Sequence, residues 1–310
     1  MAGMICGAID LGGTKIEARL FDGNMQTIAL KRAATPREDF ESFIAALVQQ
    51  IRWLESSAQD QHLPVAISMA GLIDPQSGIA TASNIPVSGQ NLGKALRDAL
   101  GRSLPMVNDC MAFAYSEAHG GAGERADSVL GLILGTGVGA GWVIDGHIPR
   151  RNAGLAVEIG HVGMPDRAIQ RHGLPTWPCG CGRMACHENY VSGTGLRRIA
   201  EWAGIAECDP AVIAGRAAQD AKAARVMGIW ADLTGEMLYT AQLILDPQVI
   251  VLGGGLSNIP GLPGLLTAAL GRLRLGQVRL PEIRVARHGD SSGARGAALM
   301  ARAGMTGELQ

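Results

Sequence analysis

Three buried strands in this chain each run directly into a glycine-rich turn. The apolar runs MICGAID, VLGLIL and PQVIVL lead into the turns at 12–15, 135–139 and 253–255. Glycine tolerates positive φ and has no Cβ, so such a turn lets backbone N–H groups converge on one anion. We therefore expect phosphate-binding turns at the strand ends. For any single turn, a tight hairpin is the alternative.

The strand and turn pattern occurs near the start of the chain and again from about residue 128, which suggests a duplication. Strands alternate with amphipathic helices such as the one expected over 38–60, and this predicts an α/β fold with mostly parallel sheets covered on both faces. Two similar halves predict a central cleft. We assign an N-terminal domain to 1–118 and a C-terminal domain to 119–291. We expect the closing helix, at about 292–305, to pack on the first.

Composition narrows the possible partners of the 310-residue chain. Its formal net charge is -1 without runs of like charge, and only 4% of its residues are aromatic. These values disfavour nucleic acid and anionic membranes as partners, and favour small molecules. No apolar run reaches the roughly 18 residues of a membrane span, and no signal-peptide pattern is present. We expect a soluble, cytoplasmic protein.

The glycine turns differ from the two commonest nucleotide-binding motifs. A Walker A sequence is absent, and GTGVGAG lacks the following helix and ribose-binding acid of a dinucleotide fold. Asp10 lies directly before the first turn, where its carboxylate could hold Mg²⁺ through waters against phosphates. Capping of the turn is the alternative role for this residue.

Asn108 and Asp109 end the strand PMVND. Ligands of open α/β sheets gather at the carboxyl ends of strands, so Asp109 is a candidate base for transfer of a phosphoryl group to an alcohol. Asp also favours the N-cap of a helix, and MAFAYSEAHG follows. The residues alone leave both roles open and favour the cap.

Four potential zinc ligands lie in the loop over 161–186. His161, Cys179, Cys181 and Cys186 supply one imidazole and three thiolates, which suit a closed, structural tetrahedral Zn²⁺ site. A redox pair of thiols is the alternative, although no Cys-x-x-Cys is present in this loop.

The motifs IDLGGTK, NDC, LGTGVGAG, EIGH, CGCGRMACHE and VIVLGGGLSN occur in this order, and together they resemble the ROK family (repressors, open reading frames and kinases). The resemblance covers essentially the whole chain. It implies two actin-like (ribonuclease H-like) α/β domains around a central cleft, with a small zinc-binding loop, ATP across the phosphate turns and sugar at the base of the cleft. Ala185 departs from the pattern, because the family usually has Gly there.

The resemblance also implies roles for individual residues. Asp109 would be the catalytic base and a sugar ligand. The other implied sugar ligands are Asn84, Asn108, Glu158, His161 and Glu188. The turns and the resemblance together place ATP and Mg²⁺ at Asp10, Gly12, Gly13, Thr14, Lys15, Gly135, Thr136, Gly137, Gly254 and Gly255. His161 would also bind the structural zinc with the three cysteines.

The implied activity is ATP-dependent phosphorylation of the 6-hydroxyl of a free hexosamine or hexose. NIPVSGQ, ENYVSGTG and ARHGDSSGARGAA favour N-acetyl-D-glucosamine, giving its 6-phosphate, with a fructokinase or glucokinase as the alternative. A sugar-sensing repressor of the family would carry a helix-turn-helix extension ahead of the first turn, and we do not expect one here. A structural actin relative would not need the sugar and zinc residues. Family analogy implies a homodimer.

Overall fold

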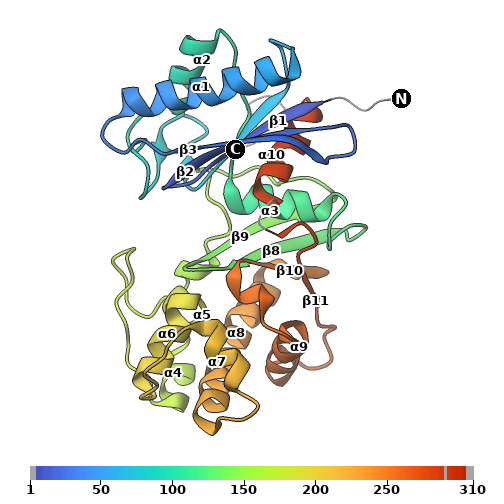
Figure 1. The fold of residues 1–310 in the computed structure, drawn as a ribbon. Coiled ribbons are helices and arrows are strands. Elements are labelled where there is room, and N and C mark those ends of the chain that lie inside the picture. Colours follow the sequence, from blue (N-terminus) through green and yellow to red (C-terminus); the bar gives the residue numbers. More distant parts are fainter. Residues whose placement is uncertain (1–4, 290–291, 305–310) are drawn as a thin grey trace. The chain divides into compact units, whose positions relative to one another are not determined.

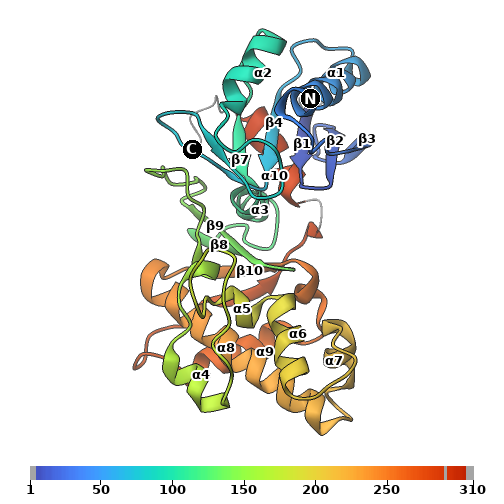
Figure 2. The same cartoon turned by 90° about the vertical axis from the view of Figure 1, so that its left-hand side faces the viewer.

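The computed structural model describes residues 5–289 and 292–304 and divides the chain into two compact units. The first unit contains the described residues up to His119, the segment Gly141–Ala156 and the described residues from Ser292 on. The second contains Gly120–Ala140 and Val157–Gly289. Figures 1 and 2 show the elements of each unit. Because 141–156 belongs to the first unit, these limits differ from the sequence-based boundary, and the functional domain limits stay a prediction.

A mixed five-stranded sheet forms the centre of the first unit, in the order β3-β2-β1-β4-β7. Its strands are β1 (Cys6–Leu11), β2 (Lys15–Phe21), β3 (Thr27–Ala34), β4 (Val65–Met69) and β7 (Met106–Asn108). β1, β2 and β3 pair antiparallel, whereas β1, β4 and β7 pair parallel. β2 and β3 thus form a hairpin after the first glycine turn. A small second sheet pairs β5 (Leu72–Ile73) with β6 (Ala80–Thr81).

Helices cover both faces of this sheet (Figure 1). They are α1 (Phe40–Ala58), α2 (Leu92–Leu100), α3 (Asp109–Ala118) and α10 (Ser292–Arg302). On α1, Phe43, Leu47 and Ile51 recur at helical spacing and are fully buried in one cluster with Ile9 of β1. The next residue of β1, Asp10, points to the opposite face, where α10 packs against β1, β4 and α3.

The second unit is built on the sheet β11-β10-β8-β9. Its strands are β8 (Ser128–Leu134), β9 (Val138–Ile144), β10 (Val249–Gly253) and β11 (Glu282–Val285). β8, β10 and β11 are parallel, and β9 continues into the segment that belongs to the first unit. The helices of this unit are α4 (Asp166–His172), α5 (Glu188–Val191), α6 (Gly193–Trp202), α7 (Pro210–Arg216), α8 (Ala221–Leu245) and α9 (Leu262–Arg272), with short 3₁₀ turns η1 (Ile159–His161) and η2 (Gly255–Asn258).

The long helix α8 organises the helical part of the second unit. It packs against α4, α5, α6, α7 and α9, and Trp230 at its centre is fully buried and donates to the Val191 carbonyl at 2.9 Å. Two of its carboxylates bind α4: Glu236 pairs with Arg167 at 2.5 Å, and Asp232 pairs with Arg171 at 2.6 Å. These contacts hold α4, which lies in the chain between the predicted metal ligands His161 and Cys179.

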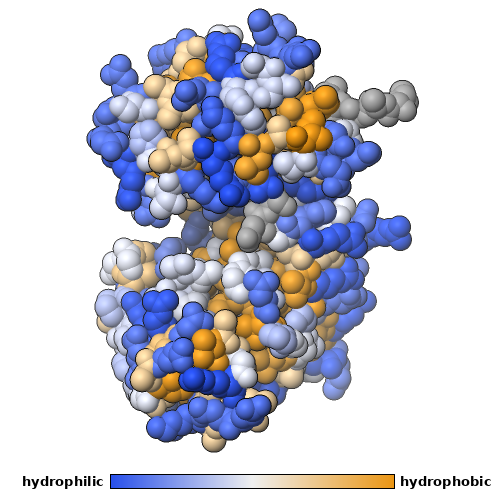
Figure 3. Space-filling view, viewed as in Figure 1, coloured by the Kyte–Doolittle hydropathy of each residue, from blue (hydrophilic) through white to orange (hydrophobic). Residues whose placement is uncertain are grey.

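On the face seen in Figure 3, hydrophilic side chains predominate and apolar groups lie between them. On the edge strand β3, Ile28 is 53% exposed and Leu30 is 42% exposed. At the end of α8, Leu243 and Ile244 are exposed as well. Across the described ranges, no helix combines the length and apolar character that crossing a membrane requires. The homodimer expected by analogy stays a prediction.

Candidate active site

The first glycine turn closes the β1–β2 hairpin. Gly12 N–H donates to the Lys15 carbonyl at 3.0 Å, and Thr35, directly after β3, donates its hydroxyl to the Gly12 carbonyl at 2.8 Å. A Cβ on Gly13 would lie 2.6 Å from the Cβ of Asn84, so glycine is required for this approach. The fold thus brings the predicted sugar ligand Asn84, which is exposed, beside the predicted phosphate turn.

Asp10 lies at the end of β1 in a setting that favours its neutral form. Burial raises its pKa to about 6, and the negative charges of Asp109 and Glu17 add to this rise. Ser68, its register partner on β4, has a buried hydroxyl oxygen without a hydrogen-bond partner in the described residues. A carboxylate that is close to a second carboxylate and beside a phosphate turn offers the oxygen donors that Mg²⁺ prefers.

Asn108, not Asp109, is the N-cap of α3. Its side-chain oxygen accepts from the Cys110 and Met111 N–H groups at 2.9 and 3.3 Å, while its amide nitrogen donates to the Gly71 carbonyl at 3.1 Å. The capping role that the residues alone favoured for Asp109 is therefore wrong. The reason is that β7, paired with β4, ends at Asn108, one residue earlier than expected, so Asp109 falls at the first helical position.

Asp109 is left with a carboxylate suited to accepting a proton. The Cys110 N–H donates to its Oδ1 at 2.9 Å, and the Cys110 thiol contacts the same oxygen, so neither contact engages Oδ2. Burial raises the pKa of Asp109, although hydrogen bonds from Cys110 and Asn108 oppose the rise. A carboxylate at a helix N-terminus whose pKa is raised towards neutrality has the properties of a general base.

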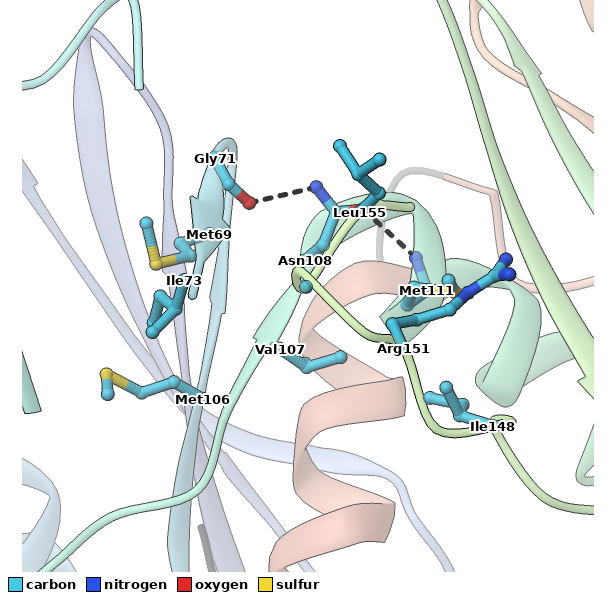
Figure 4. Close-up of a pocket in the computed structure, with 11 residues that line it drawn as sticks. Met69, Gly71, Ile73, Met106, Val107, Asn108, Met111, Ile148, Arg151 and Leu155 are labelled. Carbon is cyan, nitrogen blue, oxygen red and sulfur yellow. Dashed lines mark hydrogen bonds between the residues drawn. The ribbon is translucent and has the colours of Figure 1, made fainter. Parts of the chain in front are cut away.

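A small cavity lies beside Asn108 (Figure 4). Met69, Ile73 and Met106 line one side, and the loop that carries Arg151 and Leu155 lines the other. The cavity has a volume of about 30 Å³, which suits one or two waters or a methyl group. It is therefore too small for a hexose ring and does not by itself form the sugar site.

The second and third glycine turns meet within the second unit. Gly135 N–H donates to the Gly137 carbonyl at 3.0 Å, which closes the turn between β8 and β9. Gly254, at the end of β10, has φ 78° and ψ 172°, and a Cβ there would lie 2.5 Å from the Leu134 carbonyl oxygen. Two of the predicted phosphate turns are therefore neighbours because β8 and β10 pair in parallel.

These two turns line a cavity of about 650 Å³ within the second unit. Gly135, Thr136 and Gly255 contribute from the turns, and the start of α6 contributes Gly193 and Thr194. The remaining lining residues are Arg197, Asp209, Pro210, Ala211, Ala214, Gly215, Leu256, Asn258, Ile259 and Pro260. The volume lies in the range of small-molecule sites, and apolar walls next to a turn rich in N–H groups suit a nucleotide.

The four predicted zinc ligands come together. Their ligand atoms all lie within 4.8 Å of one another, with Cys179 Sγ 3.6 Å from His161 Nδ1 and Cys181 Sγ 3.6 Å from Cys186 Sγ. Tetrahedral bonds of about 2.0–2.3 Å to zinc would place ligand atoms roughly 3.5–3.8 Å apart. The donor set and spacing therefore fit Zn²⁺. Ala185 has φ 57°, a conformation that favours glycine, the residue expected at this position from the family resemblance.

The two predicted glutamates occupy different settings. Glu158 precedes η1, is exposed and makes no side-chain cap hydrogen bond, so its carboxylate is open to a ligand. Glu188 begins α5, and its Oε2 accepts from the Val138 N–H at 3.0 Å. Of the predicted sugar ligands of the second unit, His161 belongs to the cysteine cluster and Glu188 Oε1 lies 3.9 Å from Cys179 Sγ.

Comparison with known proteins identifies the family. The model of the ROK family matches residues 6–303. This chain belongs to the ROK family. An N-acetylgalactosamine kinase of Shewanella sp. (strain ANA-3) is 37% identical over 294 residues, 94% of this chain and 95% of that protein. An N-acetyl-D-glucosamine kinase of Photobacterium profundum is 37% identical over 295 residues, 94% of this chain and 97% of that protein.

A solved structure agrees with this placement. The ROK hexokinase of Thermus thermophilus superposes with a TM-score of 0.83 at 32% identity, covering 97% of this chain and 99% of that one. The predicted resemblance is confirmed, and the α/β class with mixed sheets is that of a ROK sugar kinase fold, consistent with actin-like ATPase domains.

Sequence reasoning missed part of this ROK protein's candidate nucleotide pocket. Thr194 donates its hydroxyl to the Thr136 carbonyl at 2.8 Å, and Gly193 N–H donates to the Gly135 carbonyl at 2.7 Å. The motif SGTG, in which Ser192 caps α6 by accepting from Gly195 N–H, was the available signal. Nothing in the order of residues linked it to a turn about sixty positions earlier.

Proposed function

We propose that this ROK protein transfers the terminal phosphoryl group of ATP to the 6-hydroxyl of a free N-acetylhexosamine, with N-acetyl-D-glucosamine as the main substrate. Full-length similarity to N-acetyl-D-glucosamine kinases of several bacteria, at 34–38% identity, supports this choice. N-acetyl-D-galactosamine, which differs at C4, is the second candidate, because a kinase for that sugar is equally similar. Fructose and glucose follow. Cytoplasmic localisation belongs to the same proposal.

The observation that carries the proposal is the state of Asp109. Its Oδ1 accepts from the Cys110 N–H, and burial raises the pKa of the carboxyl although hydrogen bonds from Cys110 and Asn108 oppose the rise, which supports a role as proton acceptor. As the sugar oxygen attacks the terminal phosphorus of ATP, the 6-hydroxyl proton passes to Asp109 and ADP leaves with the electrons of the broken O–P bond. Asn108 holds the base in place by capping its helix.

The nucleotide would bind where backbone N–H groups gather. We assign its phosphates to the first turn (Gly12, Gly13, Thr14 and Lys15) and to the second and third turns (Gly135, Thr136, Gly137, Gly254 and Gly255). The 650 Å³ cavity beside the latter would hold the nucleoside. Asp10 would hold Mg²⁺, which when bound neutralises charge on the transferred group.

The sugar would be bound by amides, carboxylates and an imidazole that match its ring hydroxyls. We assign this role to Asn84, Asn108, Asp109, Glu158, His161 and Glu188. A buried polar group that loses its partner costs about 1–3 kcal/mol, which is how such a set rejects sugars with a misplaced hydroxyl.

We assign a structural zinc ion to His161, Cys179, Cys181 and Cys186, supported by the spacing of their ligand atoms. When bound, the metal would cross-link the loop 161–186 and limit the conformations that the loop can adopt. Elemental analysis of purified protein should find one zinc per chain. Cys181→Ser should lose most of it, whereas the matched control Cys208→Ser, outside the cluster, should keep it. Equal zinc in both variants would overturn the assignment.

A coupled assay for ADP release tests the activity on N-acetyl-D-glucosamine, N-acetyl-D-galactosamine, D-fructose, D-glucose and D-mannose. We expect the highest kcat/KM on N-acetyl-D-glucosamine and a 6-phosphate product by ³¹P NMR. Asp109→Asn should lower kcat by about 10²–10⁴-fold. The control Asp98→Asn, at an exposed pair with Lys94, should leave kcat unchanged. Undiminished turnover in Asp109→Asn would refute the mechanism, and no turnover on any sugar would refute the function.

A further inference from the structure

Glu188 contacts both the second glycine turn and the cysteine cluster. Its predicted role as a sugar ligand does not account for this pair of contacts. Its Oε2 accepts from the Val138 N–H at 3.0 Å, within the second glycine turn. Its Oε1 lies 3.9 Å from the Cys179 Sγ of the cysteine cluster. One carboxylate therefore bridges the metal-ligand cluster and the turn that lines the nucleotide cavity.

The contact with the turn is tight. A Cβ on Gly137 would lie 2.6 Å from Glu188 Oε2, so the carboxylate occupies the space that a side chain at this turn would fill. A carboxylate that accepts from a backbone N–H makes a charge-assisted hydrogen bond, which is stronger than a neutral one. The glycine at 137 thus allows Glu188 to fix where the turn enters β9.

The position of Glu188 depends in turn on the cluster loop. Cys186 lies two residues before it and forms an antiparallel bridge with Gly163. His187 is fully buried, and it donates its backbone N–H to the Val162 carbonyl at 2.9 Å. These bonds hold the start of α5 against the segment that carries His161, so a change in the packing of the four ligands moves Glu188 with it.

The second glycine turn, which Glu188 contacts, lines the candidate nucleotide cavity. Gly135 and Thr136 line it, and the Thr136 carbonyl is held by Thr194 at the start of α6. The conformation of the turn sets the direction of its N–H groups. A displacement of Val138 would therefore change the hydrogen bonds from the turn to the phosphates of a bound nucleotide.

We propose that Glu188 is a positioning residue that couples occupancy of the His161, Cys179, Cys181 and Cys186 site to the nucleotide affinity of the Gly135–Val138 turn. This inference rests on the proposed function, because it takes the cavity as the nucleotide site and zinc as the metal. Loss of one charge-assisted hydrogen bond corresponds to roughly ten- to hundredfold in a dissociation constant, which is the size of effect expected.

Isothermal titration calorimetry with ADP and Mg²⁺ tests the coupling on the full chain, with zinc content measured by elemental analysis. In the zinc-loaded protein, Glu188→Ala should weaken ADP binding about tenfold or more. Glu188→Gln keeps an acceptor without charge, so its ADP affinity should lie between those of Glu188→Ala and the parent protein. The surface variant Glu201→Gln, on α6, should bind ADP as the parent does. Each variant should retain one zinc per chain, which separates positioning from loss of the metal.

The second arm removes zinc by chelation. ADP binding should weaken about tenfold in the parent protein and show little further change in Glu188→Ala, because the link is already absent there. Equal weakening in both would show that the coupling bypasses Glu188, and unchanged ADP binding in the metal-free parent would refute the coupling itself. If the chelated protein loses its circular dichroism signal, the graded Ala and Gln series in the zinc-loaded state decides. Failure of the parent to bind ADP at all would instead refute the proposed function.

Discussion

Replacing Gly254 by alanine should separate the second and third glycine turns. This residue has φ 78° and ψ 172°, a region that only glycine enters readily. An added Cβ would lie 2.5 Å from the Leu134 carbonyl oxygen and 3.0 Å from Gly135 N, both of which are backbone atoms. Neither can swing aside as a flexible side chain would, so β8 or the turn after it must shift.

The expected cost follows from these two effects. Backbone strain at such a position is about 1–3 kcal/mol, and forcing atoms into a packed site adds about 1–3 kcal/mol. We expect Gly254→Ala to lower the free energy of unfolding by roughly 3–4 kcal/mol. The neighbouring glycine provides the control. Gly255 does not have a positive φ, and a Cβ added there would meet no atom within 4 Å beyond its chain neighbours, so Gly255→Ala should change stability by less than about 0.5 kcal/mol.

Urea unfolding followed by tryptophan fluorescence measures both variants. For a slope of about 3 kcal/mol per molar, the midpoint of Gly254→Ala should fall by about 1 M, while that of Gly255→Ala stays in place. ADP affinity should fall at least tenfold in Gly254→Ala, since the shifted backbone belongs to the nucleotide cavity. If the two alanine variants unfold at the same urea concentration, close packing of the turns is not the reason for glycine at 254.

Three other perturbations follow from the structure. Asn108→Ala should lower the free energy of unfolding by about 1–2 kcal/mol and Asn108→Ser by less, because serine retains a capping oxygen; thermal denaturation compares them. Burial favours a raised pKa at Asp232, but hydrogen bonds from α4 lower the pKa overall. The ionised carboxylate therefore stabilises the folded protein above about pH 4, and this contribution is lost on further acidification. Urea unfolding from pH 7 to 3 should therefore show a smaller loss of stability on acidification in Asp232→Asn than in the parent protein. An equal loss would exclude the contacts of Asp232 with α4 as a source of the acid sensitivity. Since the pKa of Asp10 is about 6, Mg²⁺ affinity measured by calorimetry with ADP should fall below that pH. Asp109→Asn removes a neighbouring negative charge and should move the loss to lower pH, whereas an unmoved loss would show that the two carboxylates do not interact.

Local patterns predicted several elements of the fold and the clustering of His161 with three cysteines. The spacing of Phe43, Leu47 and Ile51 was enough to predict α1, because one face of a helix must be apolar to pack on a sheet. The glycine turns were recognisable from their composition: Gly254 has positive φ, and a Cβ on Gly13 or Gly137 would collide with a neighbouring side chain. The cysteine cluster was also predictable, since three of its ligands lie within eight residues and the chain between them can reach one point.

Only the tertiary structure decided which residues share a role across long separations. It gave the N-cap to Asn108 rather than Asp109, because the pairing of β7 with β4 sets where the strand ends. It also formed α4 inside a segment without clear periodicity, since the stabilising partners of that helix are carboxylates on α8 about sixty or more residues away. The bond from Val138 to Glu188 spans fifty residues. Such contacts depend on how helices and strands pack against one another, and they cannot be predicted from the residues nearby in sequence.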